Sequence, residues 1–321
     1  MRIAIGAITR RRPQMFADLL ASFAAMRRPA GTEIIFVFAE NDRSPSVTPQ
    51  IEAFRQTVPE TVLFELEPRR GIPMARNKVL DMALGAGADL LTFVDDDEVV
   101  RADWLETMVA GFQARGLDLA GGPVRLTETS EAMTFWNRAV YAHLIYRAKK
   151  RNATRAAAVD TGRDHLLNIY TNNWALRLDT QRRLGLRFDE RLQDTGGSDT
   201  RFSLDMKAAG ARIGWIPEAW VEEPTPTKRL GFGYHYSRAR DQATNAVMLS
   251  GRSKLNAFWH ATARFLEAVV AVPLLPFTGS SGAARAVFKL GMAVGHVRGS
   301  FGRQSHHYDP AAAHFHAEVE S

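Results

Sequence analysis

Short apolar runs alternate with longer segments of helical spacing along the first third of the chain. The runs have the length and composition of buried strands, and they cover residues 3–8, 33–39, 61–66 and 90–94. Between them, apolar residues recur every three or four positions, which predicts helices at residues 14–26, 49–57 and 73–84. This alternation predicts an α/β fold with a mostly parallel, doubly wound sheet and helices on both faces.

The pattern is less regular in the middle of the chain and becomes purely helical towards the C-terminus. Here it predicts strands at 119–126 and 211–216, helices at 133–150, 178–186 and 200–209, and a mobile loop at 151–164. After Pro224-Thr225-Pro226, helices are predicted at 234–250, 255–272 and 283–297. We therefore expect two parts: a sheet domain over residues 1–227 and a helical appendage over residues 228–321 that ends in a flexible tail.

Four consecutive acids, Asp95-Asp96-Asp97-Glu98, directly follow the apolar run LLTFV. Adjacent carboxylates repel one another and raise each other's pKa unless a cation neutralises them. The chain has no cysteine, and oxygen ligands suit Mg²⁺ or Mn²⁺. Ligands of parallel sheets bind beyond the carboxyl ends of the strands. The position therefore favours a metal site over a solvated acidic turn, which is the alternative.

Four further features occur in a fixed order around this acid cluster. They are Thr9-Arg10-Arg11-Arg12-Pro13, Glu40-Asn41-Asp42, the segment EPRRGIPMARN at 67–77 and the segment FDERLQDTGGSDTRFSLDMKAAGARIGWIPEAWVEEP at 188–224. Together with the acids, they resemble family 2 glycosyltransferases with the A-type nucleotide-sugar fold, especially the exopolysaccharide sugar transferases of the succinoglycan type. The resemblance covers residues 1 to about 245, so residues 1–227 would form the catalytic domain.

The resemblance implies roles in nucleotide binding for residues that follow the first strands. Thr9 matches a threonine at the nucleotide. Arg10 replaces an aromatic residue that stacks on the base, and its guanidinium would either stack there too or contact phosphate instead. Glu40 stands where an aspartate usually contacts the base or the ribose. Arg76 and Asn77 match the "ARN" element that lies against the nucleotide.

The acid cluster matches the DxD motif of the family through Asp95 and Asp97. The resemblance implies that both lie at the metal, with Asp97 as its main ligand and Asp95 turned towards the ribose. Asp96, between them, is expected at the nucleotide sugar together with Asp95.

The late segment implies the general base and one further metal ligand. Asp199 matches the second acid of the family's "ED" pair, and Ser198 replaces the first. Glu223 stands where the family often has a histidine ligand, and a plain surface acid is the alternative. The segment Asn172-Asn173-Trp174 resembles a family segment near the acceptor, and a buried tryptophan with asparagine caps is the alternative.

The implied function is a metal-dependent, inverting glycosyltransferase that acts in cell-surface polysaccharide synthesis. It would move a sugar from a nucleotide sugar, expected to be a UDP-sugar, to a hydroxyl of a glycan or lipid-linked acceptor. Mg²⁺ or Mn²⁺ would stabilise the departing diphosphate while the base deprotonates the acceptor.

Two alternatives stay open at this point. A nucleotidyltransferase also presents acids to a metal-bound nucleotide, but it would need a glycine-rich loop after the first strand, and no glycine follows Gly6 there. A catalytically weak protein that binds a membrane surface would fit the serine at position 198 and the missing histidine.

The basic charge is concentrated near the C-terminus. The formal net charge is +6, and residues 228–308 hold 11 basic and 2 acidic residues interleaved with bulky apolar ones. Basic amphipathic helices of this kind bind anionic membrane surfaces, and a subdomain packed on the sheet is the alternative. The apolar run at 265–277 is too short to span a bilayer, and no export signal is visible. We therefore expect a cytoplasmic protein held peripherally on the inner face of the cell membrane, with no nucleic acid as partner.

Overall fold

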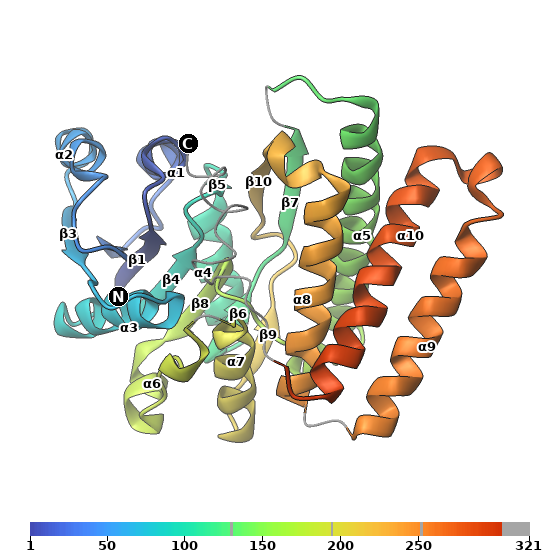
Figure 1. Cartoon of the computed structure of the whole chain (residues 1–321). Helices are drawn as coiled ribbons and strands as arrows, with labels where there is room; N and C mark the ends of the chain where they lie inside the picture. The colour runs from blue at the N-terminus through green and yellow to red at the C-terminus, as the bar shows by residue number, and fades with distance from the viewer. Residues whose placement is uncertain (129–130, 194, 251–252, 304–321) are drawn as a thin grey trace. The chain divides into compact units, whose positions relative to one another are not determined.

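The computed structural model describes residues 1–128, 131–193, 195–250 and 253–303. Its main element is a seven-stranded sheet with the order β3-β2-β1-β4-β8-β6-β9 (Figure 1). The strands of this sheet are β1 Arg2–Thr9, β2 Glu33–Glu40, β3 Thr61–Leu66, β4 Leu90–Val94, β6 Leu119–Gly121, β8 Asn173–Arg177 and β9 Ile213–Trp215. Among them, β8 runs antiparallel to β4 and β6, and the others are parallel to one another. The mostly parallel sheet predicted from the alternating pattern is confirmed.

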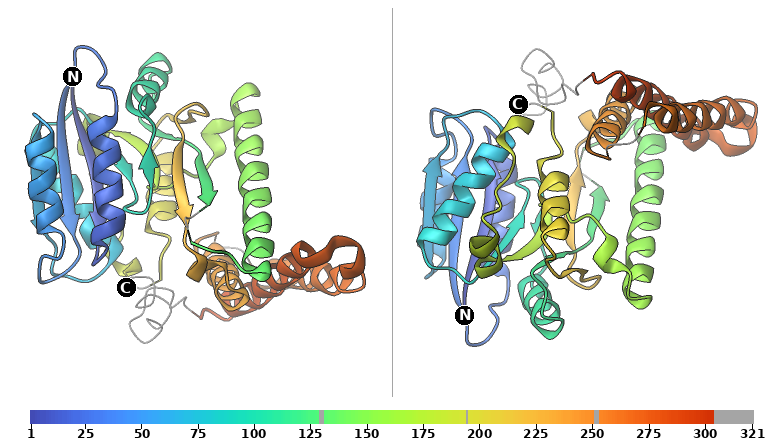
Figure 2. Two further views of the ribbon diagram at one scale, coloured as in Figure 1. Left: turned by 90° about the horizontal axis from the view of Figure 1, so that it is seen from above. Right: turned by 90° about the horizontal axis from the view of Figure 1, so that it is seen from below.

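Helices cover both faces of this sheet because successive strand residues point to opposite sides. Ile5 and Phe36 pack in one apolar core, whereas Ala4 and Val37 pack in a second core on the other side. The first core is covered by α1 (Pro13–Ala25), α2 (Thr48–Thr57) and α4 (Trp104–Ala114), and the second by α3 (Ile72–Gly85), α6 (Leu178–Leu184) and α7 (Ser198–Ala208). The two views of Figure 2 show α1 and α2 on one face and α3 on the other. Helices on both faces were predicted, although α4 was not.

The long helix α5 (Phe135–Asp160) overturns the prediction of a mobile loop at 151–164. Two polar residues of its second half, Asn152 and Arg155, contact the rest of the fold, while residues such as Lys150 and Arg151 stay exposed. Arg155 is buried, and its guanidinium lies 4.4 Å from the ring centroid of Trp215 and 5.0 Å from that of Tyr170. The amide of Asn152 donates to the carbonyl of Val124 at 3.1 Å. These contacts use the residues whose polarity had suggested a loop.

Strand β8 was not predicted, and it decides between the two roles considered for Asn173 and Trp174. Both side chains are almost fully buried. The Asn173 amide donates to the carbonyls of Pro123 at 3.0 Å and Ala219 at 2.7 Å, and it accepts from Trp104 Nε1 at 2.9 Å. The segment is therefore a structural centre that joins β8 to three neighbouring segments.

The remaining elements are a small second sheet, three short 3₁₀ helices and the C-terminal helices. The second sheet has the order β5-β10-β7, with β5 Val99–Val100, β7 Val124–Glu128 and β10 Val221–Thr225. The 3₁₀ helices are η1 Asp164–Leu166, η2 Glu190–Leu192 and η3 Thr227–Leu230. The C-terminal helices are α8 Phe232–Ser250, α9 Lys254–Ala271 and α10 Leu275–Ser300, and α10 packs against both α8 and α9. These three helices were predicted, but α10 begins earlier and contains a kink at Gly279.

The contacts divide the described residues into two compact units. Unit 1 comprises Met1–Arg125, Lys149–Gln193 and Ser198–Glu223, and unit 2 comprises the described parts of 126–148, 194–197 and 224–321. Because the units alternate along the chain, the domain boundary near residue 227 stays a prediction. The predicted flexible tail from residue 304 lies outside the described residues. Among the described helices, none is long and apolar enough to cross a bilayer.

Candidate active site

The acid cluster follows β4, whose neighbour in the sheet is β1. Asp96 and Glu98 are buried, whereas the Asp95 and Asp97 side chains keep 36% and 12% of their surface exposed. Buried and more exposed acids alternate because the chain makes a tight turn after the strand. Within this turn the backbone amide of Asp95 donates to Glu98 Oε2 at 3.0 Å. Asp95 is therefore the more exposed acid of the DxD pattern, while the Asp97 side chain is nearly as buried as that of Asp96 (8%).

Burial and crowding disfavour the ionised form of these carboxyls. Burial raises the pKa of Asp95 to about 7, against the opposing charge of Arg76. Neighbouring acids act in the same direction as burial, namely Asp97, Asp96 and Asp199. Burial also raises the pKa of Glu98 well above its usual range, and the charge of Asp95 adds to this effect. A cation at this place would relieve the repulsion within the cluster.

Asp96 joins the end of β1 to the end of β4. Thr9 Oγ1 donates to Asp96 Oδ2 at 2.7 Å, and Arg12 Nη1 donates to Asp96 Oδ1 at 3.1 Å. The same Arg12 nitrogen lies 3.9 Å from Asp97 Oδ2. Burial raises the pKa of Asp96, and the Arg12 charge opposes that rise. The described contacts of Thr9 and Asp96 thus shape the loop, while their contact with a nucleotide stays a prediction.

Arg12 is a site residue that the sequence reasoning did not single out. The signal was the run of three arginines after the first strand, from which only the first was selected. In the structure, Arg10 Nε lies 3.9 Å and Arg11 Nε 2.6 Å from the Asp42 carboxylate after β2, whereas Arg12 reaches the acid cluster. Arg11 has a left-handed backbone (φ 51°). This conformation turns the chain, so that Arg10 and Arg11 point towards Asp42 and Arg12 points towards the acid cluster.

Glu40 and Asn41 tie the end of β2 to neighbouring loops. Glu40 is fully buried, and its carboxylate accepts from the backbone amide of Ser46 at 2.8 Å and from the Ser46 hydroxyl. The Asn41 side chain accepts from the amide of Gly71 at 2.9 Å, just before α3. The structure thus places Glu40 at the carboxyl end of β2, and its contact with the base or ribose stays a prediction.

Arg76 and Asn77 are neighbours on α3, but their side chains contact different parts of the fold. The Asn77 amide exchanges two hydrogen bonds with the backbone of Phe188, at 3.0 and 2.9 Å. Arg76 points to the acids instead, with Nη2 at 3.9 Å from Asp95 Oδ1 and Nη1 donating to Ser198 Oγ at 3.0 Å. Its buried Nε has no hydrogen-bond partner among the described residues. Arg76 is therefore a buried cation with an unused donor, which suits an anionic ligand.

Asp199 and Glu223 arrive at the acid cluster from two distant segments. Asp199 lies in the first turn of α7, next to the buried Ser198, and its charge contributes to the raised pKa of Asp95. Strand β10 pairs antiparallel with β5, and this register carries Glu223 towards Glu98, whose pKa its charge also raises. The structure therefore brings both predicted residues to the acids, while their roles stay predictions.

The donor set fits a divalent metal without forming a cage for it. The described residues contain no group of three or more acids and histidines arranged as metal ligands. Mg²⁺ is usually held by one or two carboxylates together with substrate phosphates. Asp95 and Asp97 would supply such carboxylates, and the mutual repulsion within the cluster fits a cation there.

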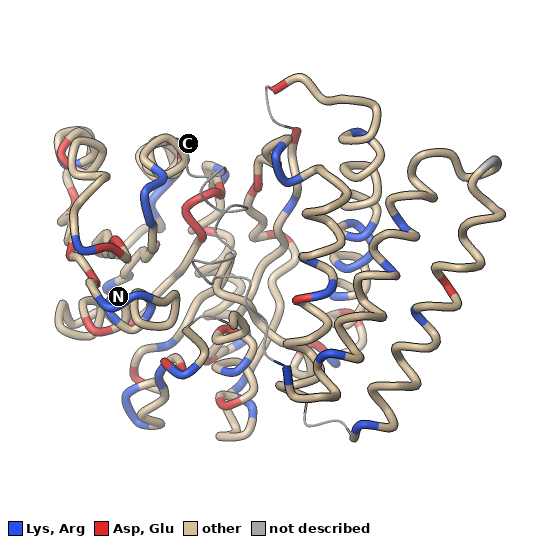
Figure 3. The backbone as a smooth tube through the Cα atoms, viewed as in Figure 1, with Lys and Arg blue, Asp and Glu red and all other residues tan. Residues whose placement is uncertain are grey.

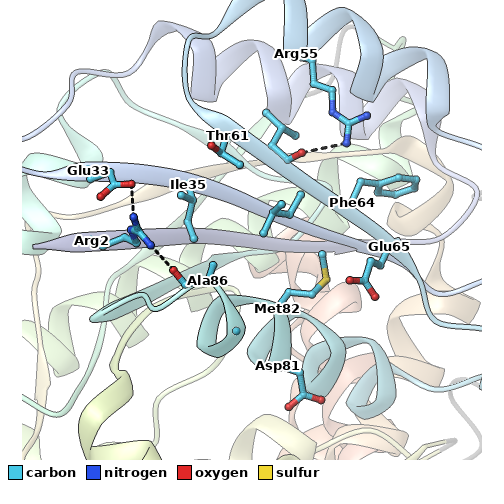
Figure 4. A pocket seen from close by; sticks show the side chains of 13 residues that line it. Arg2, Glu33, Ile35, Arg55, Thr61, Phe64, Glu65, Asp81, Met82 and Ala86 are labelled. Carbon is cyan, nitrogen blue, oxygen red and sulfur yellow. Dashed lines mark hydrogen bonds and ion pairs between the residues drawn. The ribbon is translucent and has the colours of Figure 1, made fainter.

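A hollow elsewhere in unit 1 is not this site. It measures about 710 Å³ and lies beside the edge strand β3, lined by residues such as Arg2, Glu33 and Thr61 at the amino ends of the strands (Figure 4). Arg55 donates to the carbonyl of Val62 within it. Its lining continues along β3 to Glu65 and includes none of the acid-cluster residues 95–98.

Comparisons with known proteins show the family of the chain. A family model described as glycosyl transferase family 2 matches residues 5–171, just over half of the chain. The succinoglycan biosynthesis protein ExoM of Rhizobium meliloti (strain 1021) is 34% identical over 254 residues, which cover 79% of this chain and 77% of that protein.

Two solved structures share the fold. The mannosyltransferase PcManGT from Pyrobaculum calidifontis, in complex with GDP-Man and Mn²⁺, matches with a TM-score of 0.54 and 16% identity over 99% of this chain and 79% of that one. Staphylococcus aureus TarS matches with a TM-score of 0.50 and 12% identity over 92% of this chain, which spans about half (55%) of that TarS chain. At these identities, the likeness concerns the fold alone. The family model and the relative together show that this chain is a glycosyltransferase and belongs to glycosyl transferase family 2.

Proposed function

We propose that this enzyme transfers a sugar from a nucleoside diphosphate sugar to a hydroxyl of a glycan or lipid-linked acceptor in polysaccharide synthesis. The observation that carries the proposal is the gathering of Asp95, Asp97, Arg76 and Asp199 beyond the carboxyl end of β4, from three distant segments. The participation of ExoM in succinoglycan biosynthesis supports the polysaccharide context.

Each residue has a task that its surroundings allow. Asp199 is half-buried and accepts from the Thr200 amide at 2.6 Å, which holds its carboxylate in place as a base for the acceptor hydroxyl. Loss of that proton would make the oxygen nucleophilic, and attack opposite the leaving group would invert the anomeric centre. Arg76 would donate to the diphosphate through its unused Nε.

The proposal includes Mg²⁺ or Mn²⁺ held by Asp95 and Asp97, with Glu223 as a further oxygen ligand. When bound, the metal would neutralise charge on the leaving diphosphate. PcManGT was solved as a complex with GDP-Man and Mn²⁺, which supports testing GDP-sugars beside the UDP-sugars that we expect.

We further propose that the enzyme works peripherally at the cytoplasmic face of an anionic membrane. Residues 228–308 carry nine more basic than acidic side chains (11 − 2), and anionic lipids attract such segments. A lipid-linked acceptor would remain in the bilayer, so an enzyme held at the surface would meet it there.

The test is a transfer assay on the full chain with a panel of UDP- and GDP-sugars and a lipid-linked acceptor. Release of nucleoside diphosphate should require Mn²⁺ or Mg²⁺ and stop with a chelator. The anomeric configuration of the product, measured by NMR, should be opposite to that of the donor. Undiminished turnover with the chelator would contradict the metal, and a retained configuration would contradict the mechanism.

A further inference from the structure

The outer face of α9 carries large apolar side chains that are mostly uncovered in the described structure, although Phe258 meets the ring of Phe301 edge-on at 5.9 Å. This face consists of Leu255, Phe258, Trp259, Thr262, Phe265, Leu266, Val269 and Val270, all exposed. The residues recur at spacings of three and four, so they form one continuous stripe along the helix. Leu255 is 82% exposed and Trp259 73%. An uncovered stripe of this size marks an interaction surface.

The opposite side of α9 has the reverse composition. The buried residues of α9 are Ala257, Ala261 and Ala268, and α9 packs against α10. On α10, Gly291, Gly295 and Gly299 lie so close to α8 that an added Cβ would meet α8 atoms at 2.1–2.7 Å. Small residues thus fill the helix contacts while large apolar ones face outwards. A helix in water normally shows the opposite arrangement, whereas helices that pack within lipid show this one.

The apolar surface continues into the turn between α9 and α10. Val272 and Leu274 are exposed there, and Phe277 at the start of α10 is 87% exposed. Turns in water are normally built from polar residues, glycine and proline. A partner that bound only the side of α9 would leave this turn uncovered, whereas a bilayer can cover both.

The charges around this surface are almost all positive. Glu267 is the single acid between Asp241 and Asp309 in the sequence, and it is paired with Arg264 at 2.8 Å and with Lys289. Figure 3 shows most of α9 without charge. Lys254 precedes Leu255 at the start of α9 and is exposed, and Arg285 on α10 is exposed as well. This distribution complements anionic lipid headgroups, while it would repel a second copy of the same chain.

We infer that the outer face of α9, continued through Val272, Leu274 and Phe277, inserts into the interface of an anionic bilayer. The inference rests on the proposed membrane association and names the element that makes it. The apolar side chains enter the boundary between headgroups and acyl chains, and the flanking cations stay at the headgroups. Binding therefore depends on apolar burial as well as on charge, and it persists partly at high salt, because salt screens only the charge component.

The experiment uses full-length protein and vesicles of equal parts phosphatidylglycerol and phosphatidylcholine. The test variant is Trp259→Ser combined with Phe277→Ser, because both side chains are mostly exposed and their loss leaves the packed side intact. The matched control is Trp136→Ser, since Trp136 on α5 is also an exposed tryptophan of unit 2 (52%). We expect the test variant to bind vesicles roughly a hundredfold more weakly than wild type, and the control to bind like wild type.

The outcomes separate this inference from the proposals on which it rests. Equal binding of the test variant and wild type would overturn the inference while membrane association stands. Absence of wild-type binding would overturn both. A wild-type dimer in light scattering that the test variant converts to a monomer would identify a second copy as the partner, and would also overturn it. Turnover with a water-soluble acceptor should be the same in wild type, the test variant and the control. Absence of turnover in all three would contradict the proposed sugar transfer, independently of the vesicle-binding result.

Discussion

The role of Asp199 leads to the sharpest mutational prediction. Replacement by Asn removes the negative charge but keeps Oδ1, which accepts from the Thr200 amide at 2.6 Å. Because general base catalysis contributes about 10²–10⁴-fold, the Asp199→Asn variant should lose about 3–5 kcal/mol of transition-state stabilisation. Its charge in the first turn of α7 contributes about 0.3–1 kcal/mol through the helix dipole. The fold should therefore lose little stability.

Asp205 on the same helix supplies the control. It pairs with Arg201 one turn away at 2.7 Å, an i,i+4 surface pair of about 0.3–0.5 kcal/mol. Asp205→Asn should therefore match the modest stability loss of Asp199→Asn without its loss of turnover. The assay measures release of nucleoside diphosphate at saturating donor, beside donor affinity by calorimetry. More than a tenth of wild-type turnover in Asp199→Asn, or an equal loss in Asp205→Asn, would refute the assignment of the base.

Two further predictions concern stability. Asn173→Ala should cost about 2–5 kcal/mol in denaturant unfolding, because it leaves the Ala219 carbonyl and the Trp104 indole without their partner, whereas the Pro123 carbonyl still accepts from the Val221 amide at 3.0 Å; a loss below about 1 kcal/mol would contradict the structural role of β8. In unit 2, burial lowers the pKa of His143 to about 4 and that of His235 to about 3, with nearby cations such as Arg147 acting in the same direction. Since the unfolded chain then binds more protons below pH 6.5, stability should fall as the pH drops from 6.5 towards 4, by about 2 kcal/mol at pH 5 for His143 alone. His143→Gln should flatten that dependence, and an unchanged pH profile would show that the ring is not buried in its neutral form.

The strands and helices that a local pattern encodes were predicted well. The first four strands are short apolar runs, and three of them (β1, β2 and β4) are buried on both faces, so that such runs carry their own signal. Strand β8 gave no comparable signal, because its first residues Asn173 and Trp174 are fixed by hydrogen bonds and ring contacts from distant segments. The second half of α5 was missed for a related reason, since the surroundings of Arg155 decide whether a polar stretch is a loop.

The candidate site was predictable as a set of residues but not as an arrangement. The position of Asp95 and Asp97 after an apolar strand was sufficient to select them. The resemblance added Asp199 and Glu223, but only the packing of α7 and the register of β10 bring them to the acids. The direction of Arg12 depends on the left-handed residue before it, and no pattern in the sequence indicates that conformation.

The central claim is that the acid cluster holds the metal and the nucleotide of the donor. Its most direct test is calorimetric binding of UDP and GDP to wild type, with and without Mn²⁺, beside Asp97→Asn and Asp103→Asn. Asp103 is a suitable control because it is a nearby acid that pairs with Arg101 at 2.8 Å. The account predicts that binding of at least one nucleotide requires Mn²⁺ in wild type and Asp103→Asn, and is lost in Asp97→Asn. Binding of equal affinity in Asp97→Asn, or without any metal, would contradict it.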